Sequence, residues 1–229
     1  MPPTATLPVP PDPPVALERP RLRGWLHAAA VPSVIVAGAI LVARAPNAGS
    51  TAALVVYWVA MTALFGVSAA FHRVRWQPAA RRRMRRADHA TIFVGIAGTY
   101  TAVAALALSG WARLVVLLLV WVGGGAGVAL RQLWLDAPKW AVSLPYIVVG
   151  WCALAVIPQL MRGMGTGGFT LLVLGGAAYT AGAVVYARKR PDPVPRVFGY
   201  HEVFHACTLI GASLHYAAVF AYALPAAAH

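Results

Sequence analysis

Runs of apolar residues, each close to twenty residues long, alternate with short polar segments along most of this chain. In a helix, about twenty residues span roughly 30 Å, the thickness of the hydrocarbon core of a bilayer. Seven such runs predict helices near residues 24–42, 51–71, 88–108, 111–130, 140–160, 168–187 and 200–224. The pattern therefore predicts an all-α, polytopic membrane protein built as a bundle of seven transmembrane helices.

The polar segments between the runs contain residues that end helices, including Pro46, Gly49 and Pro138. At the N-terminus, residues 1–22 are rich in proline and lack the apolar stretch of a signal peptide, which predicts a disordered tail. Residues 23–229 then form one transmembrane domain, and no soluble domain of useful size remains.

The composition agrees with a membrane solvent. Hydrophobic residues make up 60% of the chain and charged residues 11%, and the mean hydropathy is +0.68, whereas a soluble domain carries roughly a quarter charged residues. The two cysteines, Cys152 and Cys207, each lie within an apolar run and far apart in sequence. They indicate neither a disulfide framework nor a cysteine-rich metal site.

The net charge of +13 has a membrane explanation as well. Lys and Arg lie between the apolar runs and are not interleaved with exposed aromatics, which argues against nucleic acid as a partner and for lipid headgroups. In the seven-helix arrangement 16 of these residues fall on the side of the N-terminus, and only Arg44, Arg113 and Arg162 on the other. The asymmetry predicts a multi-pass protein of the plasma (inner) membrane with a cytoplasmic N-terminus and an external C-terminus.

A few polar residues are expected at membrane depth, where ionisable groups are costly and usually functional. Ser68 and His72 are four residues apart at the end of the second helix, and His201 and His205 have the same spacing at the start of the seventh. This spacing places each pair on one helix face. Asp88 is expected to open the third helix. All five groups reach the cytoplasmic side at one depth.

Three imidazoles with an open fourth position are typical of a catalytic Zn²⁺ site, in which the ion acidifies a bound water. The predicted ligands are His72, His201 and His205. Asp88 is then the candidate general base, and the Ser68 hydroxyl the candidate donor to a developing oxyanion.

Simpler roles exist for several of these residues. Asp88 is also a plausible N-cap of the third helix, and Ser68 an interhelical hydrogen-bonding residue. His72, taken alone, fits an interfacial histidine. His27, near the start of the first helix, fits either an interfacial residue or a partner of the metal site.

His215 lies fourteen residues beyond His201, or about 21 Å along a helix. It is therefore expected to pack between helices or line a cavity and not to bind the same ion. His89 is expected to point away from Asp88, and His229 is terminal. Neither is assigned a role.

Several ordered motifs resemble the hemolysin III family, the bacterial branch of the progestin and adiponectin receptor superfamily, which is similar to membrane-embedded alkaline ceramidases. The resemblance runs from Arg23 to Tyr216. The motifs are R-G-W-L-H at 23–27, S-x-x-x-H at 68–72, D-H-x-x-I-F at 88–93, A-G-T-Y-T at 97–101 and H-x-x-x-H at 201–205, followed by His215.

The resemblance implies a seven-helix bundle with a cytoplasmic N-terminus and a zinc ion held by His72, His201 and His205, with Ser68 and Asp88 nearby. It also implies hydrolysis of lipid amides, and so a lipid or fatty acyl ligand inside the bundle. One departure is Ala102, where members of the family often carry proline. That substitution concerns a helix kink more than the metal site.

Two other functions stay open. Residues 201–205 also match H-E-x-x-H, the metalloprotease motif in which Glu202 would be the general base. Such an enzyme needs a later ligand, commonly acidic, and no Asp or Glu follows Glu202. The other alternative is a receptor-like or membrane-homeostasis regulator in which the zinc is structural.

Overall fold

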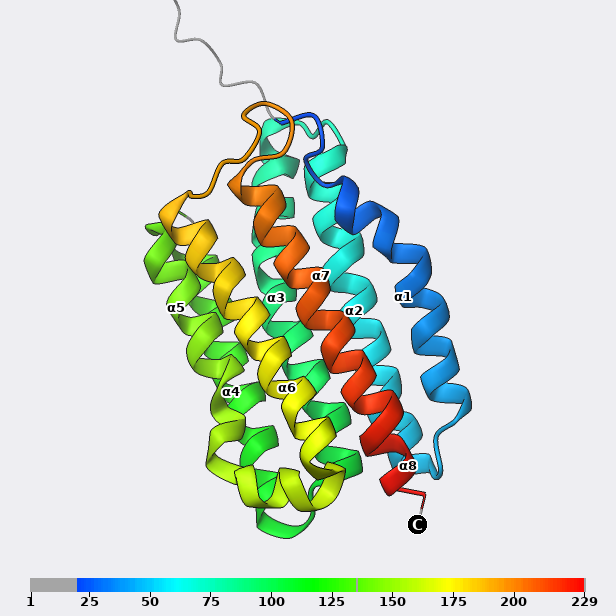
Figure 1. Ribbon diagram of the computed structural model, residues 1–229. Coiled ribbons are helices and arrows are strands. Elements are labelled where there is room, and N and C mark those ends of the chain that lie inside the picture. The colour runs from blue at the N-terminus through cyan, green and yellow to red at the C-terminus, as the bar shows by residue number, and fades with distance from the viewer. Residues whose placement is uncertain (1–19, 135, 229) are drawn as a thin grey trace, which may run out of the picture.

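A computed structural model of the chain describes residues 20–134 and 136–228, and within this part the structure is helical (Figure 1). The only extended pairing there is an isolated bridge between Val194 and Phe198. The helices are α1 (Trp25–Ala43), α2 (Ala48–Arg73), α3 (Pro78–Ala107), α4 (Gly110–Leu133), α5 (Lys139–Gly150), η1 (Cys152–Val156), α6 (Ile157–Arg188), α7 (Tyr200–Ala218), η2 (Val219–Ala223) and α8 (Leu224–Ala226). The all-α prediction is confirmed.

Among the described residues, six helical segments are long and apolar enough to cross a bilayer, so the protein has the character of a polytopic membrane protein. The fifth segment, Lys139–Arg188, has 50 residues and contains α5, η1 and α6. At Gly165 the backbone leaves the helical region, with φ at 66° and ψ at 174°. The chain folds back here, and α5 and α6 lie side by side in the bundle (Figure 1).

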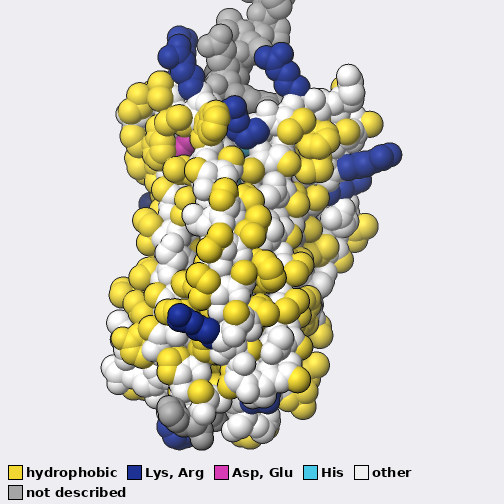
Figure 2. All heavy atoms as spheres, turned by 90° about the vertical axis from the view of Figure 1, so that its right-hand side faces the viewer, with side chains coloured by type: hydrophobic (Ala, Val, Ile, Leu, Met, Phe, Trp, Pro, Cys, Tyr) yellow, Lys and Arg dark blue, Asp and Glu magenta, His cyan; other side chains and the backbone are white. Residues whose placement is uncertain are grey.

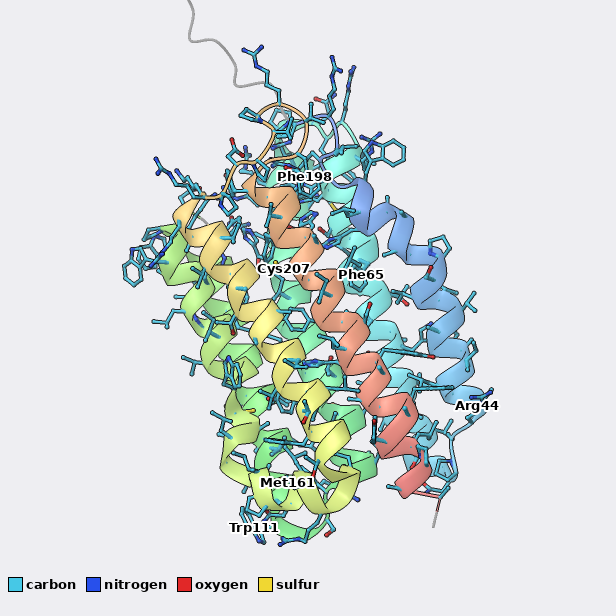
Figure 3. All side chains as sticks on the ribbon, in the orientation of Figure 1. Arg44, Phe65, Trp111, Met161, Phe198 and Cys207 are labelled. Atoms are coloured by element: carbon cyan, nitrogen blue, oxygen red, sulfur yellow. The ribbon has the colours of Figure 1, made fainter. Side chains whose placement is uncertain are left out.

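On the face shown in Figure 2, many hydrophobic side chains lie along the side of the bundle, and most of the Lys and Arg side chains lie toward its ends. Val59, Leu114 and Val122 are examples of large hydrophobic residues that are more than half exposed. Arg44 and Trp111 lie toward the end opposite to residue 20 (Figure 3). A surface with so many exposed hydrophobic side chains has lipid as its natural solvent.

Small residues allow the helices to approach closely. A methyl group at Gly98 of α3 would collide with Ala60 of α2, and one at Gly211 of α7 would lie 3.0 Å from the carbonyl oxygen of Gly175 in α6. Close contact through glycine and alanine is the usual mode of helix packing in membranes, where burial of apolar surface gives no net driving force.

Helix α3 begins ten residues earlier than the predicted 88–108. Its N-cap is Gln77, and Pro78 occupies the first turn, where the missing N–H and the fixed φ of proline are favourable. The basic residues that follow are good helix formers, so they extend the helix instead of forming a loop. Asp88 therefore lies inside α3, and its interpretation as the N-cap is wrong.

The later helices also differ from the predicted ranges. The predicted 140–160 is regular only to Gly150 and continues as the 3-10 turn η1, and α6 begins at Ile157, ahead of the predicted 168. At the C-terminal end, the predicted 200–224 comprises α7, the π-helical turn η2 and the start of α8. Of the predicted tail, residues 1–19 lie outside the described part of the chain, as does His229.

Candidate metal centre

Three histidines meet at the end of the bundle where α2 ends and α7 begins. His72 is in the last turn of α2, while His201 and His205 lie one turn apart at the start of α7. The Nε2 atoms of His72 and His201 are 3.2 Å apart, and one ligand atom from each of the three histidines lies within 4.8 Å of the others. Tetrahedral Zn–N bonds of about 2.0–2.1 Å place neighbouring nitrogens roughly 3.3 Å apart. The three imidazoles therefore fit one metal ion after a small adjustment.

Asp88 and Ser68 lie beside the histidine cluster. The Oδ2 atom of Asp88, in α3, is 4.0 Å from Nε2 of His72. Ser68 is buried one turn before His72, and both Ser68 and Asp88 line the cavity that His201 and His205 also line. The His72 side chain is only 8% exposed, which does not fit an isolated interfacial histidine. The five residues selected from the sequence thus come together from three helices.

Glu202 has a different environment from the histidines on either side of it. Its carboxylate is fully buried and forms an ion pair through Oε1 with Nε of Arg23. Its other oxygen, Oε2, accepts a hydrogen bond of 2.9 Å from the backbone N–H of Gly199. One carboxylate oxygen thus fastens the start of α7 to the segment that precedes α1, and the other caps the N-terminus of α7.

His27 is a neighbour of the histidine cluster. It is 2% exposed, so the interfacial interpretation is wrong. Its ring stacks on the ring of His205, with a centroid separation of 3.9 Å and an interplanar angle of 10°. The sequence does indicate that His27 lies in the first turn of an apolar helix, at the same end of the bundle as the three histidines of the cluster. It does not predict the stacking on His205, because this contact depends on how α1 packs against α7.

His215 and His89 both have partners away from the three-histidine cluster. His215 lies 3.0 Å through Nε2 from the carbonyl oxygen of Leu172, a contact between α7 and α6. His89 Nδ1 accepts from the guanidinium of Arg131, at 2.7 Å, because arginine can only donate. The sequence does not predict this contact, because Arg131 begins a polar segment that is expected to be exposed. In the structure Arg131 is buried.

Lys139 is a second basic residue with partners that the sequence does not reveal. Its Nζ lies 4.2 Å and 4.1 Å from the ring centroids of Tyr186 and Tyr200, and it donates a hydrogen bond of 2.7 Å to the Tyr200 hydroxyl. The contact joins the start of α5 to the end of α6 and the start of α7. The two cysteines, by comparison, are both unpaired thiols, as expected.

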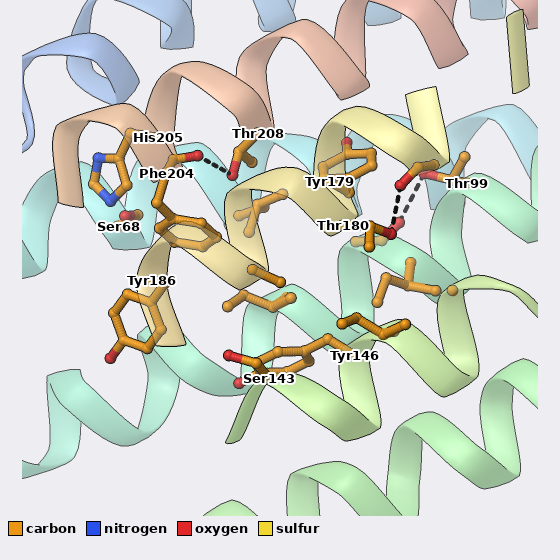
Figure 4. A pocket seen from close by; sticks show the side chains of 18 of the residues that line it. Ser68, Thr99, Ser143, Tyr146, Tyr179, Thr180, Tyr186, Phe204, His205 and Thr208 are labelled. Carbon is orange, nitrogen blue, oxygen red and sulfur yellow. Dashed lines mark hydrogen bonds between the residues drawn. The ribbon is translucent and has the colours of Figure 1, made fainter. Parts of the chain in front are cut away.

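An elongated cavity leads from the cluster into the bundle (Figure 4). Ser68 and His205 lie at one end of the view, and Thr99, Tyr179 and Thr180 at the other. The cavity also reaches His215, ten residues after His205 and therefore about 15 Å further along α7.

The hydroxyl groups of the cavity wall are largely used by the backbone. Thr99 donates to the carbonyl oxygen of Gly95, Thr180 to that of Gly176 and Thr208 to that of Phe204, at distances of 2.8, 2.8 and 3.0 Å. The remaining lining is rich in aromatic and aliphatic side chains. The cavity therefore offers an apolar channel that begins at a cluster of titratable side chains.

These features define a class: an all-helical membrane protein with a buried histidine and carboxylate centre at one end of an apolar internal cavity. Residues 15–216 match the family described as Haemolysin-III related, and the chain belongs to this family. It is 29% identical to Hemolysin-3 of Bacillus cereus over an alignment of 192 residues, and this alignment covers 82% of this chain and 84% of that protein. It is also 27% identical over 199 residues to the Hemolysin-3 homolog of Bacillus subtilis (strain 168), with 86% and 90% covered. The resemblance found in the motifs is confirmed.

Proposed function

We propose that this haemolysin-III-related protein is a zinc-dependent hydrolase that acts on lipid amides within the membrane. His72, His201 and His205 are the proposed zinc ligands. The observation that carries the proposal is the position of these histidines, which lie close together and two of which, His201 and His205, line one end of an apolar cavity inside the bundle. Chemistry on a lipid needs such a reactive group at the end of a space for a hydrocarbon chain.

The neighbouring side chains supply the remaining roles. The three imidazoles would hold the zinc ion, which would supply Lewis acidity at this centre. Asp88, whose Oδ2 lies 4.0 Å from Nε2 of His72, is the proposed general base that would accept a proton from the water that attacks the amide. The Ser68 hydroxyl, on the same face of α2 as His72, is the proposed donor to the oxygen that gains negative charge when the amide carbonyl is attacked.

The shape and chemistry of the cavity support an N-acyl lipid as the substrate. The Thr99, Thr180 and Thr208 hydroxyls donate to backbone carbonyls and so have no hydrogen left to give to a sugar or another highly polar molecule, and much of the remaining lining is aromatic or aliphatic. A fatty acyl chain needs none. The similarity of the family to alkaline ceramidases points to the same kind of substrate.

The proposed topology has seven crossings in the plasma membrane. The fold-back at Gly165 supports two crossings within Lys139–Arg188, one through α5 and η1 and one through α6. The 16 to 3 distribution of Lys and Arg supports a cytoplasmic N-terminus, and an odd number of crossings then makes the C-terminus external.

A second candidate function is that of a receptor-like regulator with a structural zinc ion. The observation in its favour is the closeness of Asp88 to His72, because a fourth protein ligand would close the site. The metalloprotease alternative has less support. Glu202 would have to be the general base, yet its two oxygens are engaged by Arg23 and by the backbone of Gly199.

Substitution of Asp88 by Asn tests the hydrolase proposal. The amide cannot accept a proton, so Asp88→Asn should lower the turnover of a ceramide or another N-acyl lipid about 10²–10⁴-fold, with bound zinc and thermal stability retained. Turnover is measured by mass spectrometry of the released fatty acid from protein in lipid nanodiscs.

Asp136→Asn is the matched control, because the Asp136 side chain is 86% exposed and pairs only with Arg85 among the described residues. This variant should keep wild-type turnover. If Asp88→Asn instead loses zinc, and the wild type releases no fatty acid from any N-acyl lipid above a zinc-free control, the structural-zinc function replaces the hydrolase.

A further inference from the structure

His27 is a buried histidine to which the proposed chemistry gives no role. It lies in the first turn of α1, is 2% exposed and lines the cavity together with Ser68 and His205. Neither of its ring nitrogens makes a hydrogen bond of normal geometry within the described part of the chain, although the backbone of His205 lies beside the ring. Buried polar atoms nearly always have a partner, so these two nitrogens require an explanation.

The ring of His27 has a defined orientation. One face stacks on His205 at a centroid separation of 3.9 Å, and the edge contact with Phe65 has a separation of 4.9 Å and an interplanar angle of 84°. The imidazole is thus held between α2 and α7. Rotation toward another partner would break both contacts.

The backbone before α1 is held in place as well. The ion pair between Arg23 and Glu202 connects this segment to α7. Gly24 has φ at 80°, and a methyl group there would lie 2.6 Å from Cβ of His72. Only glycine permits this approach to α2, so the chain just before His27 is packed directly against a proposed metal ligand.

We propose that His27 binds the polar head of the lipid that occupies the cavity, through a hydrogen bond between a ring nitrogen and a carbonyl oxygen of that lipid. The proposal rests on the proposed function, because it takes a lipid to be the occupant. Three threonine hydroxyls of the wall are already used by backbone carbonyls, whereas the nitrogens of His27 have hydrogen-bonding capacity to spare. His27 therefore orients the acyl carbonyl next to the histidine cluster.

The test compares two probes without a hydrolysable bond, methyl dodecyl ketone and tetradecane, which have the same chain length and differ in one carbonyl oxygen. Their binding to purified protein is measured by native mass spectrometry. His27→Phe keeps a ring between His205 and Phe65 but removes the nitrogens. It should weaken binding of the ketone about five- to tenfold, the effect of one hydrogen bond, and leave binding of tetradecane unchanged.

A second pair of variants covers the case in which His27→Phe does not fold. His27→Gln keeps a hydrogen-bond donor and should retain the preference for the ketone over tetradecane, while His27→Leu should lose it. An unchanged preference in His27→Phe or His27→Leu would overturn the proposal, and equal weakening of both probes would assign His27 to packing alone. Zinc content is measured on the same samples, so that a ketone preference lost while zinc is retained is assigned to His27, and a loss of zinc is assigned to the metal centre.

Discussion

Glu202 shows how one residue can match a catalytic motif and yet have another role. Its fully buried carboxylate pairs with Arg23, whose side chain is 19% exposed. Removal of one partner from a buried ion pair leaves an uncompensated charge and typically costs about 3–5 kcal/mol. Removal of both partners costs less, because no unpaired charge remains.

We therefore expect Glu202→Gln to lower the thermal unfolding temperature markedly, and Arg23→Gln combined with Glu202→Gln to recover part of the loss. Both proteins should still bind zinc, because Glu202 is not directed at the histidines. The measurement is a double-mutant cycle of thermal unfolding in detergent, with metal content determined in parallel. Additive effects of the two substitutions would contradict the ion pair, and loss of turnover at full stability would favour the protease.

The sequence alone is sufficient to select the histidines that meet, because i, i+4 spacing near a helix end fixes which side chains share a face. His201 and His205 share a face of α7 in this way, and His72, at the end of α2 that lies at the same depth, completes the cluster. The surroundings of His27 and His89 could not be predicted, since ring stacking on His205 and the contact with Arg131 depend on how helices distant in sequence pack.

At the scale of the helices, the contact between α6 and α7 supports the site, because α7 carries two of the three histidines. Gly211 of α7 faces α6 so closely that a methyl group would lie 2.7 Å from Cδ2 of Tyr179 and 3.0 Å from the Gly175 carbonyl oxygen. The backbone carbonyl cannot move aside as the end of a flexible side chain can.

Gly211→Ala should consequently destabilise the protein by about 1–3 kcal/mol, as overpacking does. The matched control is Gly125→Ala in α4, where a methyl group meets nothing within 4 Å. There the better helix propensity of alanine should leave stability unchanged or raise it by up to about 1 kcal/mol. Thermal unfolding of both variants in the same detergent decides the matter, and equal stability of the two would contradict the close contact.

Helix positions were predictable from apolar runs, but helix ends were not. The start of α3 at Pro78 lies within a basic segment that reads as a loop, because hydropathy cannot distinguish a polar helical extension from a turn. The chain folds back at Gly165, within a glycine-rich stretch for which the sequence predicts a turn. The structure differs from this prediction because the residues on both sides of Gly165 are helical.

The whole molecule is an apolar bundle whose proposed topology has seven crossings. We expect single cysteines at exposed positions, in a background lacking Cys152 and Cys207, to report the side of each loop. Gln77→Cys should react with a membrane-impermeant maleimide only in broken cells, and Ala48→Cys and Ala228→Cys in intact cells. Reaction of Ala228→Cys only in broken cells would instead indicate six crossings.

The class of the molecule follows from its composition and periodicity, because a surface this apolar has few other solutions than a helical bundle in lipid. Its chemistry is less accessible from the sequence. Ligand spacing indicates a metal centre, yet spacing does not distinguish an open site from one that Asp88 closes.

The proposed metal centre is tested most directly by the metal content of the purified protein and four variants, measured by inductively coupled plasma mass spectrometry. The wild type should contain about one zinc per chain, and His72→Ala, His201→Ala and His205→Ala should each lose most of it. His215→Ala should keep it, because His215 is engaged with the Leu172 carbonyl away from the cluster. Zinc retained in full by the first three variants, or absent from the wild type, would contradict the proposed metal centre.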